Sequence, residues 1–376
     1  MSEKVVKISR ISLLGQGVAC DADGNIYFVP RAIPGDTVKV RVVSQDKKYC
    51  ESELLEVLQA SPERVEPPCE YFHSCGGCDW LHWDYQHQLR GKQEMILHAM
   101  ERTSLQPKQI LPILGAQASL NYRNRIQLRV GSGKLGFFKK KSHDLVDIKE
   151  CKIAHPLINS EIKKIRESGI PKTETVQKLE LYINEASEVK RVTNEAHGSE
   201  GFRQINEEQN KQLQECVSRH VEQSNAQNVV ELFCGNGNLT FAYFNKVKSV
   251  FAIDGSQAAI DQAKKKREEL GIKAHNSSTA FICDMVNRST YRKLPSEIKG
   301  HYDTLIVDPP RSGLAGTLTQ LVHKELKTLI YVSCSVQTFA QDVQCLKSQF
   351  SFDELQPIDM FPQTRHIEFV AKFTRI

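Results

Sequence analysis

Long apolar runs are missing from this chain of 376 residues. No stretch approaches the roughly 18 consecutive apolar residues of a membrane-spanning helix. Residues 1–15 also lack the apolar core and the small-residue cleavage site of a secretion signal. These absences exclude a helical membrane span and predict a cytoplasmic protein without a membrane partner. A strong net charge is missing as well, because the formal value is +5, and this value alone neither indicates nor excludes a nucleic-acid partner.

The glycine-rich segment ELFCGNGNLT, residues 231–240, lacks the signatures of diphosphate-binding loops. It is not a complete G-x-G-x-x-G, which disfavours hydride transfer, and no G-K-[ST] follows, which excludes a P-loop. It does follow a strand-like run and open a helix, and Asp254 ends the next strand-like run, where an acid would bind ribose hydroxyls. Asp284 ends the third such run, where an acid would face adenine. The pattern favours S-adenosylmethionine; the alternative is a strand–loop–helix without a ligand.

The eleven cysteines are not expected to form a disulfide framework, because the cytoplasm keeps thiols reduced. Cys69, Cys75 and Cys78 form C-x5-C-G-G-C, and Cys151 is a distant fourth. Zinc prefers two separated C-x-x-C pairs, so three close cysteines plus one favour a [4Fe–4S] cluster. The spacing also differs from the C-x-x-x-C-x-x-C of radical enzymes. The alternative is four reduced cysteines without a metal.

Punctuation by glycine and proline divides the chain into three expected domains. Short strand-like runs in residues 1–60 predict an OB-type β-barrel, which either binds nucleic acid or is purely structural. Residues 61–200 are expected to form a β-rich iron–sulfur and RNA-binding domain, with a helix at about 84–102 packed on the catalytic domain. Residues 201–376 alternate strands and helices, which predicts an α/β class I, Rossmann-like domain with a mostly parallel sheet.

Basic residues are concentrated in residues 121–143, a segment without Asp or Glu. They are Arg123, Arg125, Arg129, Lys134, Lys139, Lys140 and Lys141. With Tyr122, Phe137 and Phe138 available for stacking, they predict either a surface that contacts phosphates and bases or a solvated hairpin.

Three segments near the end carry the chemistry: DPPRSG at 308–313, YVSCS at 331–335 and FPQTRHIEF at 361–369. Asp308, Cys334 and Glu368 end or follow strand-like runs, so we expect them to meet at one sheet edge. Uracil C5 becomes nucleophilic when a thiolate adds at C6, and a base must then remove the C5 proton. Cys334 is the candidate nucleophile, Glu368 the candidate base, and Asp308 a group for the uracil edge or the cofactor.

Arg311 narrows the reaction class. Amine methyltransferases carry an aromatic residue in this position of [ND]PP[YFW], and cytosine-C5 enzymes usually carry a second cysteine there. Arginine therefore argues against both classes and favours uracil, where it would support the loop or a developing oxyanion.

Over nearly its whole length the chain resembles the RNA uracil-5-methyltransferases, in particular the branch with a TRAM barrel and an iron–sulfur domain. The matching segments are GQGVA, PGD, CEYFHSCGGC, YRNR, LGFFKKKSHDLVDIKEC, FRQIN, ELFCGNGN, DPPRSG, YVSCS and TRHIEF. The chain departs from the family at Arg203, where an aromatic is usual, at Asp254, where many members have glutamate, and in its shorter central domain.

The resemblance implies a set of roles. Cys334 is implied as the nucleophile and Glu368 as the base. The implied cluster ligands are Cys69, Cys75, Cys78 and Cys151. The implied S-adenosylmethionine contacts are Gln204, Phe233, Asn238, Asp254, Asp284 and Asp308.

From these patterns we expect a monomeric enzyme that forms 5-methyluridine in RNA. Having both a barrel and a cluster favours 23S rRNA as the substrate. The alternatives are the same reaction on tRNA and a non-catalytic iron–sulfur protein that binds RNA.

Overall fold

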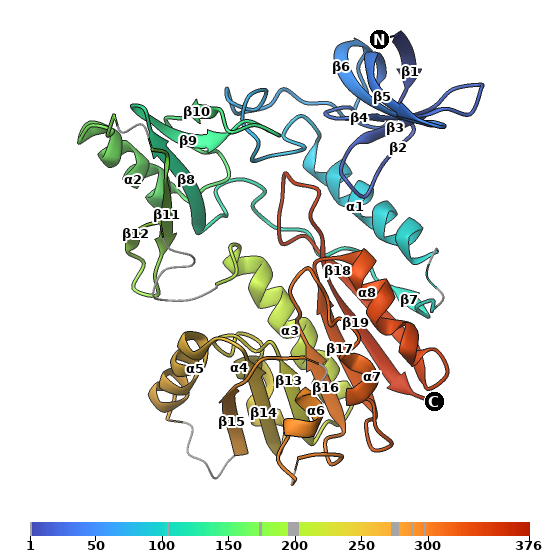
Figure 1. Ribbon diagram of the computed structural model, residues 1–376, viewed down its shortest axis with the longest axis vertical. Coiled ribbons are helices and arrows are strands. Elements are labelled where there is room, and N and C mark those ends of the chain that lie inside the picture. The colour runs from blue at the N-terminus through green and yellow to red at the C-terminus, as the bar shows by residue number, and fades with distance from the viewer. Residues whose placement is uncertain are drawn as a thin grey trace. The chain divides into compact units, whose positions relative to one another are not determined.

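The computed structural model describes residues 2–101, 103, 105–172, 175–194, 203–271, 278–287, 289–296 and 298–376. The chain divides into two compact units, each built from several segments (Figure 1). Unit 1 comprises residues 1–95, 116–195 and 361–366. Unit 2 comprises residues 96–115, 196–360 and 367–376. Helix α1 (Tyr85–Met100) continues across the division, so the expected helix exists, and its packing on the catalytic domain stays a prediction.

Unit 1 begins with a six-stranded sheet in the order β1-β5-β6-β4-β3-β2. The strands are β1 (Glu3–Lys7), β2 (Arg10–Ile11), β3 (Gly17–Cys20), β4 (Ile26–Val29), β5 (Thr37–Asp46) and β6 (Tyr49–Gln59). Apolar side chains alternate along them, and the inward set, including Ala19, Val29 and Val38, forms a small core. The short strands expected here are therefore present; their closure into an OB-type barrel stays a prediction.

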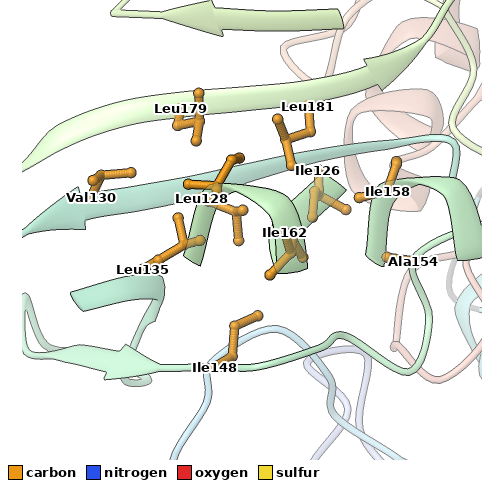
Figure 2. Close-up of a cluster of buried hydrophobic side chains, with 11 residues drawn as sticks. Ile126, Leu128, Val130, Leu135, Ile148, Ala154, Ile158, Ile162, Leu179 and Leu181 are labelled. Atoms are coloured by element: carbon orange, nitrogen blue, oxygen red, sulfur yellow. The ribbon is translucent and has the colours of Figure 1, made fainter. Parts of the chain in front are cut away.

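The second sheet of unit 1 has five antiparallel strands in the order β10-β9-β8-β11-β12. They are β8 (Arg125–Gly131), β9 (Lys134–Phe138), β10 (Leu145–Asp147), β11 (Gln177–Ile183) and β12 (Val189–Thr193). Figure 2 shows side chains of β8 and β11 directed at helix α2 (Pro156–Glu167). Ile158 and Ile162 of α2 are fully buried in this cluster, so burial of apolar area fixes the helix on one face of the sheet.

Unit 2 contains an eight-stranded sheet in the order β15-β14-β13-β16-β17-β19-β18-β7. Its strands are β7 (Gln109–Ile110), β13 (Asn228–Leu232), β14 (Ser249–Asp254), β15 (Ser278–Cys283), β16 (Thr304–Val307), β17 (Thr328–Ser333), β18 (Phe350–Ile358) and β19 (Glu368–Arg375). Its helices include α3 (Glu207–Gln223), α4 (Thr240–Tyr243), α5 (Gln257–Glu269), α6 (Thr290–Lys293), α7 (Leu318–Leu321) and α8 (Val336–Asp342). The strands from β15 to β17 are parallel, which confirms the Rossmann-like fold expected for residues 201–376.

Strand directions in unit 2 decide where the chemistry lies. The parallel strands β13, β14, β15, β16 and β17 all end at one edge of the sheet. Strand β19 is antiparallel to β17, and Ser333 pairs with Phe369. Cys334 follows Ser333 and Glu368 precedes Phe369, so both lie at that same edge. Because Val307 pairs with Tyr331, Asp308 lies there as well.

Among the described residues, none of the helices combines the length and the apolarity that a membrane crossing requires.

Candidate active site

The loop after β13 is built from left-handed backbone. Phe233, Gly235 and Gly237 have φ values of 61°, 54° and 83°, and an aromatic residue reaches this region only at a cost in strain. A Cβ at Gly237 would lie 2.5 Å from the Phe241 ring, so this turn requires glycine. The loop therefore exposes backbone where larger residues would block it, as expected for a ligand-binding turn.

Asp254 holds this loop from the neighbouring strand. Its carboxylate accepts hydrogen bonds from the Gly235 N–H at 2.9 Å and the Ser256 N–H at 2.8 Å. Asp284, at the end of β15, donates its own N–H to the Asp254 carbonyl at 3.0 Å and pairs with Lys293 at 2.7 Å. The two acids thus lie on adjacent strand ends, as the sequence predicted.

Asn238 and Gln204, also implied for the cofactor, do not lie at the ends of strands. Asn238 lies in the loop after β13, and Gln204 precedes α3. The Asn238 side chain exchanges hydrogen bonds with the Asn210 amide at 2.8 and 2.9 Å and accepts one from Gln214 at 3.0 Å. Its amide therefore fastens the loop to α3, and its cofactor role stays a prediction. Gln204 is partly buried just before α3, and Asn206 caps that helix by accepting from the Gln209 N–H.

Glu231 is a buried carboxylate that the sequence analysis did not single out. It lies on β13, is 1% exposed, and accepts hydrogen bonds from Thr240 Oγ1 at 2.8 Å and Tyr243 Oη at 2.5 Å. Burial raises its pKa to about 7. Both donors belong to α4, so Glu231 holds this helix beneath the loop. The sequence does contain a signal for this residue, because Glu231 is an acid within the apolar run VVEL of a buried strand.

Cys334, Glu368, Asp308 and Arg311 form one electrostatic group at the sheet edge. Cys334 is partly exposed, whereas Glu368 is 5% exposed. Burial, followed by the nearby Glu368, raises the pKa of Cys334 to about 11. The positive charge of Arg311, beside the thiol, lowers the pKa of Cys334. Arg311 is thus the cation that favours the thiolate.

Burial and the proximity of Asp308 raise the pKa of Glu368 well above its usual value, while Arg311 lowers it. Burial raises the pKa of Asp308 to about 7. Two carboxyl groups that disfavour each other's ionisation share protons. The edge therefore presents a nucleophile, a proton-accepting carboxyl pair and one guanidinium.

The loop that carries Cys334 is fixed from both sides. Ser333 Oγ accepts the Ser335 N–H and donates to the Ser335 carbonyl, each at 3.1 Å. Ser335 also caps α8 by accepting the Thr338 N–H. Beneath the loop, the Phe339 ring packs edge-on against Tyr331 at 5.1 Å and Phe369 at 5.0 Å. Packing thus determines where the thiol points.

In unit 1, the four cysteines expected as cluster ligands line one cavity of about 300 Å³. Burial raises the pKa of each thiol, that of Cys75 to about 11. The pKa of Cys78 is raised further by Cys151, Cys75 and Cys69 in turn, so the four thiols lie near one another around this cavity. In the part of the chain that the structure describes, no group of three or more His, Cys, Asp or Glu side chains is arranged to hold a metal ion.

The basic segment 121–143 differs from the surface expected of it. Arg125 is buried against Glu180 at 3.3 Å, Lys140 pairs with Asp79 at 2.7 Å, and Lys139 pairs with Asp144 at 3.4 Å. Asp79 and Glu180 come from distant segments, which a local charge count cannot reveal, whereas Asp144 directly follows the basic segment.

Tyr122, expected to stack on bases, is instead buried and donates its hydroxyl to the Pro362 carbonyl at 3.0 Å. That expectation was wrong. Phe138 is partly exposed, and Arg129 lies over its ring at 5.1 Å, so this pair remains a candidate for stacking.

Known proteins similar to this chain include RNA methyltransferases. Residues 170–375 match the family model of tRNA (uracil-5-)-methyltransferases. An RNA methyltransferase of Bdellovibrio bacteriovorus, described as uncharacterized, is 30% identical over 98% of this chain and 94% of its own. The 23S rRNA (uracil(1939)-C(5))-methyltransferase RlmD of Histophilus somni is 27% identical over 98% of this chain and 95% of its own.

The fold is also that of a solved structure, the Pyrococcus abyssi tRNA (uracil-54, C5)-methyltransferase in complex with S-adenosyl-L-homocysteine. The two structures superpose with a TM-score of 0.75 over 99% of this chain and 100% of that one, at 23% identity. The family model covers more than half of the chain, and the relatives match along nearly all of it. This chain therefore belongs to the tRNA (uracil-5-)-methyltransferase family.

Proposed function

We propose that the chain performs its family's reaction, S-adenosylmethionine-dependent methylation of uracil C5 in RNA, with Cys334 as the nucleophile and Glu368 as the base. The observation that carries the assignment is the meeting of Asp308, Cys334 and Glu368 at one sheet edge, with the charge of Arg311 acting on the thiol. Each role in the chemistry has a side chain there.

The chemistry balances with these groups. The Cys334 thiolate forms a bond to uracil C6, and the C5–C6 π electrons move toward O4 as an enolate. Arg311, beside the thiol, is placed to offset this negative charge. S-adenosylmethionine, when bound, would supply the methyl group to C5, with S-adenosylhomocysteine as the leaving group. Glu368 then removes the C5 proton, the C5–C6 double bond re-forms, and the S–C6 bond breaks to return the Cys334 thiolate. Glu368 must be ionised for this step, so the proton that the carboxyl pair holds has to leave first.

S-adenosylmethionine supplies the methyl group. The residues present fit such a ligand, because Gly235 faces open space beside the loop and two acids end the adjacent strands. In this proposal Asp254 binds the ribose hydroxyls and Asp284 lies near the adenine. Phe233, Gln204, Asn238 and Asp308 complete the contacts, and Asn238 acts by holding the loop.

We also propose that Cys69, Cys75, Cys78 and Cys151 bind a [4Fe–4S] cluster. Four thiols around one cavity are the donor set that such a cluster takes. A four-iron cluster separates its sulfur ligands more widely than a single ion does, so a shared cavity suits it better than tetrahedral zinc. The cluster would hold the segments around residues 69–78 and 151 together, and the methyl transfer does not need it.

For the substrate we favour 23S rRNA. In this proposal an OB-type barrel in residues 1–60 and a central domain in residues 61–200 hold the RNA. The enzyme acts as a monomer in the cytoplasm. The name of the Histophilus relative supports this choice. The Pyrococcus protein acts on tRNA, so tRNA is the alternative. In the central domain, the Arg129–Phe138 pair and the exposed Lys134 and Lys141 are the candidate contacts, because stacking and phosphate contacts together hold unpaired nucleotides.

Methylation of rRNA and tRNA transcripts by anaerobically purified protein, with the modified nucleotide mapped, tests both parts. We expect 5-methyluridine in a 23S rRNA fragment and its complete loss in Cys334→Ala. Activity on tRNA alone would overturn the substrate choice. Methyl transfer that persists in Cys334→Ala would overturn the covalent mechanism. RNA binding without methylation by the wild-type protein would favour the non-catalytic alternative.

Cys345→Ala is the matched control. Cys345 is also partly buried in unit 2, but it lies in the turn after α8, where it donates to the Asp342 carbonyl at 3.4 Å. Its loss is expected to leave the methylation rate within about twofold of wild type.

A further inference from the structure

One carboxylate oxygen at the end of α8 joins a strand and a loop of the site. Asp342 Oδ2 accepts the Tyr331 hydroxyl at 2.7 Å and the Leu314 backbone N–H at 2.7 Å. Tyr331 is buried on β17, three residues before Cys334. Leu314 ends the DPPRSG loop that follows β16. Asp342 therefore links the loop that carries Arg311 to the strand that carries the nucleophile.

The DPPRSG loop is shaped around this carboxylate. Gly313 has a φ of 70°, and a Cβ there would lie 2.5 Å from Asp342 Oδ2 and 3.1 Å from Thr338 Cβ. Both contacts come from α8, so only glycine lets the loop approach the helix this closely. Arg311, two residues earlier, is exposed, and its positive charge lowers the pKa of the Cys334 thiol.

Helix α8 itself is firmly placed. Ser335 caps its first turn and directly follows Cys334. Phe339 is fully buried among the rings of Tyr331, Phe352, Phe369 and Phe373. A carboxylate on a fixed helix is a suitable anchor for a loop, because its own position does not depend on that loop.

We propose that Asp342 is a positioning residue that sets the contact between Arg311 and Cys334 by holding the Leu314 end of the DPPRSG loop. The inference rests on the proposed role of Cys334. Asp342 does not touch the reacting atoms in this proposal. It fixes a guanidinium whose placement decides how readily the thiol ionises and how well the enolate is stabilised.

The test compares Asp342→Ala, which removes both hydrogen bonds, with Asp342→Asn, whose amide oxygen keeps an acceptor. Asp342→Ala is expected to lower kcat by about tenfold or more, with the KM for S-adenosylmethionine within about threefold, because Asp254 and Asp284, proposed for the ribose and the adenine, lie on other strands. Asp342→Asn is expected to recover most of kcat. The matched control is Gln341→Ala, an exposed neighbour on the same helix, which should match wild type.

A second measurement needs no RNA. Alkylation of Cys334 by iodoacetamide, followed by peptide mass over a pH series, reports the thiol directly. In Asp342→Ala the midpoint should move to higher pH, as in Arg311→Ala, and the double variant should add little to either single change. A merely structural role would lower the melting temperature and leave this midpoint in place.

Outcomes separate the two proposals. An unchanged alkylation profile with full kcat in folded Asp342→Ala, or additive losses in the double variant, would overturn the positioning role. Methyl transfer that persists in Cys334→Ala would overturn the nucleophile assignment. In that case the shift of the alkylation midpoint in Asp342→Ala would still test whether Asp342 acts on Cys334 through Arg311. If Asp342→Ala does not fold, Asp342→Leu, which keeps the branched shape of the side chain but removes both hydrogen bonds, serves the same comparison.

Discussion

Cys334 and Glu368 are neighbours across antiparallel strands: Cys334 follows the last residue of β17, and Glu368 is the first residue of β19. The pairing of Ser333 with Phe369 places them at the same edge. One of the two is partly exposed and the other is buried. The proposed nucleophile therefore faces the solvent side, while the proposed base lies deeper, where its proton affinity is raised.

This arrangement predicts that Glu368→Gln stops the reaction after the bond to RNA has formed. The amide cannot remove the C5 proton, so the S–C6 bond cannot break. Incubation with RNA and S-adenosylmethionine should give a denaturation-resistant protein–RNA complex and little released product. Turnover should fall by about 100-fold or more. The double variant Cys334→Ala/Glu368→Gln is the control and should give no complex; if it did, the bond would belong to another residue.

The pH dependence of kcat/KM follows from the raised pKa of Cys334, about 11. Only the thiolate attacks, so kcat/KM should rise with pH from about 7 to about 9 without levelling off. Ionisation of Glu368, whose pKa is also raised, acts in the same direction. Arg311→Ala removes a cation that lowers both pKa values, so its profile should shift to higher pH. A wild-type plateau below about pH 8 would contradict this assignment.

Glu231 should make stability depend on pH. Its pKa is about 7 in the folded protein against 4.5 for a free side chain, so the folded state binds the proton more tightly. The protonated Glu231 side chain therefore adds to the free energy of unfolding. This contribution, up to about 3 kcal/mol, is complete below about pH 4.5 and is lost as the pH rises through about 7. Urea unfolding at several pH values should show wild type losing stability over this range relative to Glu231→Gln. Parallel curves for the two proteins would refute the prediction.

Iron content tests the cysteine cavity. Anaerobically purified protein is expected to contain about four iron atoms and as many sulfides per chain. Cys78→Ser should lose most of this iron, whereas Cys50→Ser, a buried thiol of the first sheet, should keep it. Zinc in place of iron would contradict the cluster. Chelation should lower the melting temperature of unit 1 in wild type and leave Cys78→Ser unchanged.

The sequence was sufficient for the parts of the site that depend on strand ends. Asp254, Asp284, Asp308, Cys334 and Glu368 each begin, end or directly follow a strand. Parallel connectivity brings the first four together, and the antiparallel strand β19 adds Glu368 at the same edge. The family assignment and the Rossmann-like sheet are confirmed. The roles of the site residues, the cluster, the closure of the barrel and the three domain boundaries stay predictions.

The sequence was not sufficient where long-range pairing decides the outcome. The sequence pattern predicts Arg125 as a surface charge, but Arg125 is paired with Glu180. It also makes Tyr122 available for stacking on bases, but the Tyr122 hydroxyl donates to the Pro362 carbonyl. Asp342 gave no local signal, because its two partners come from a strand and a loop that precede it in the chain. Such contacts depend on how segments pack, which local patterns do not encode.

The position of β19 in the sheet has a consequence for the order of events during synthesis. Strand β18 is made before β19, yet β19 lies between β17 and β18. On a growing chain, β18 can therefore pair only with the two-residue strand β7 until residues 368–375 have emerged. Its connection to β17 and the rest of the sheet, through β19, forms late. Because Glu368 begins that strand, the carboxylate and the thiol come together only with this closing step. A nascent chain would thus carry an exposed cysteine without its base, and be unable to complete a turnover on RNA.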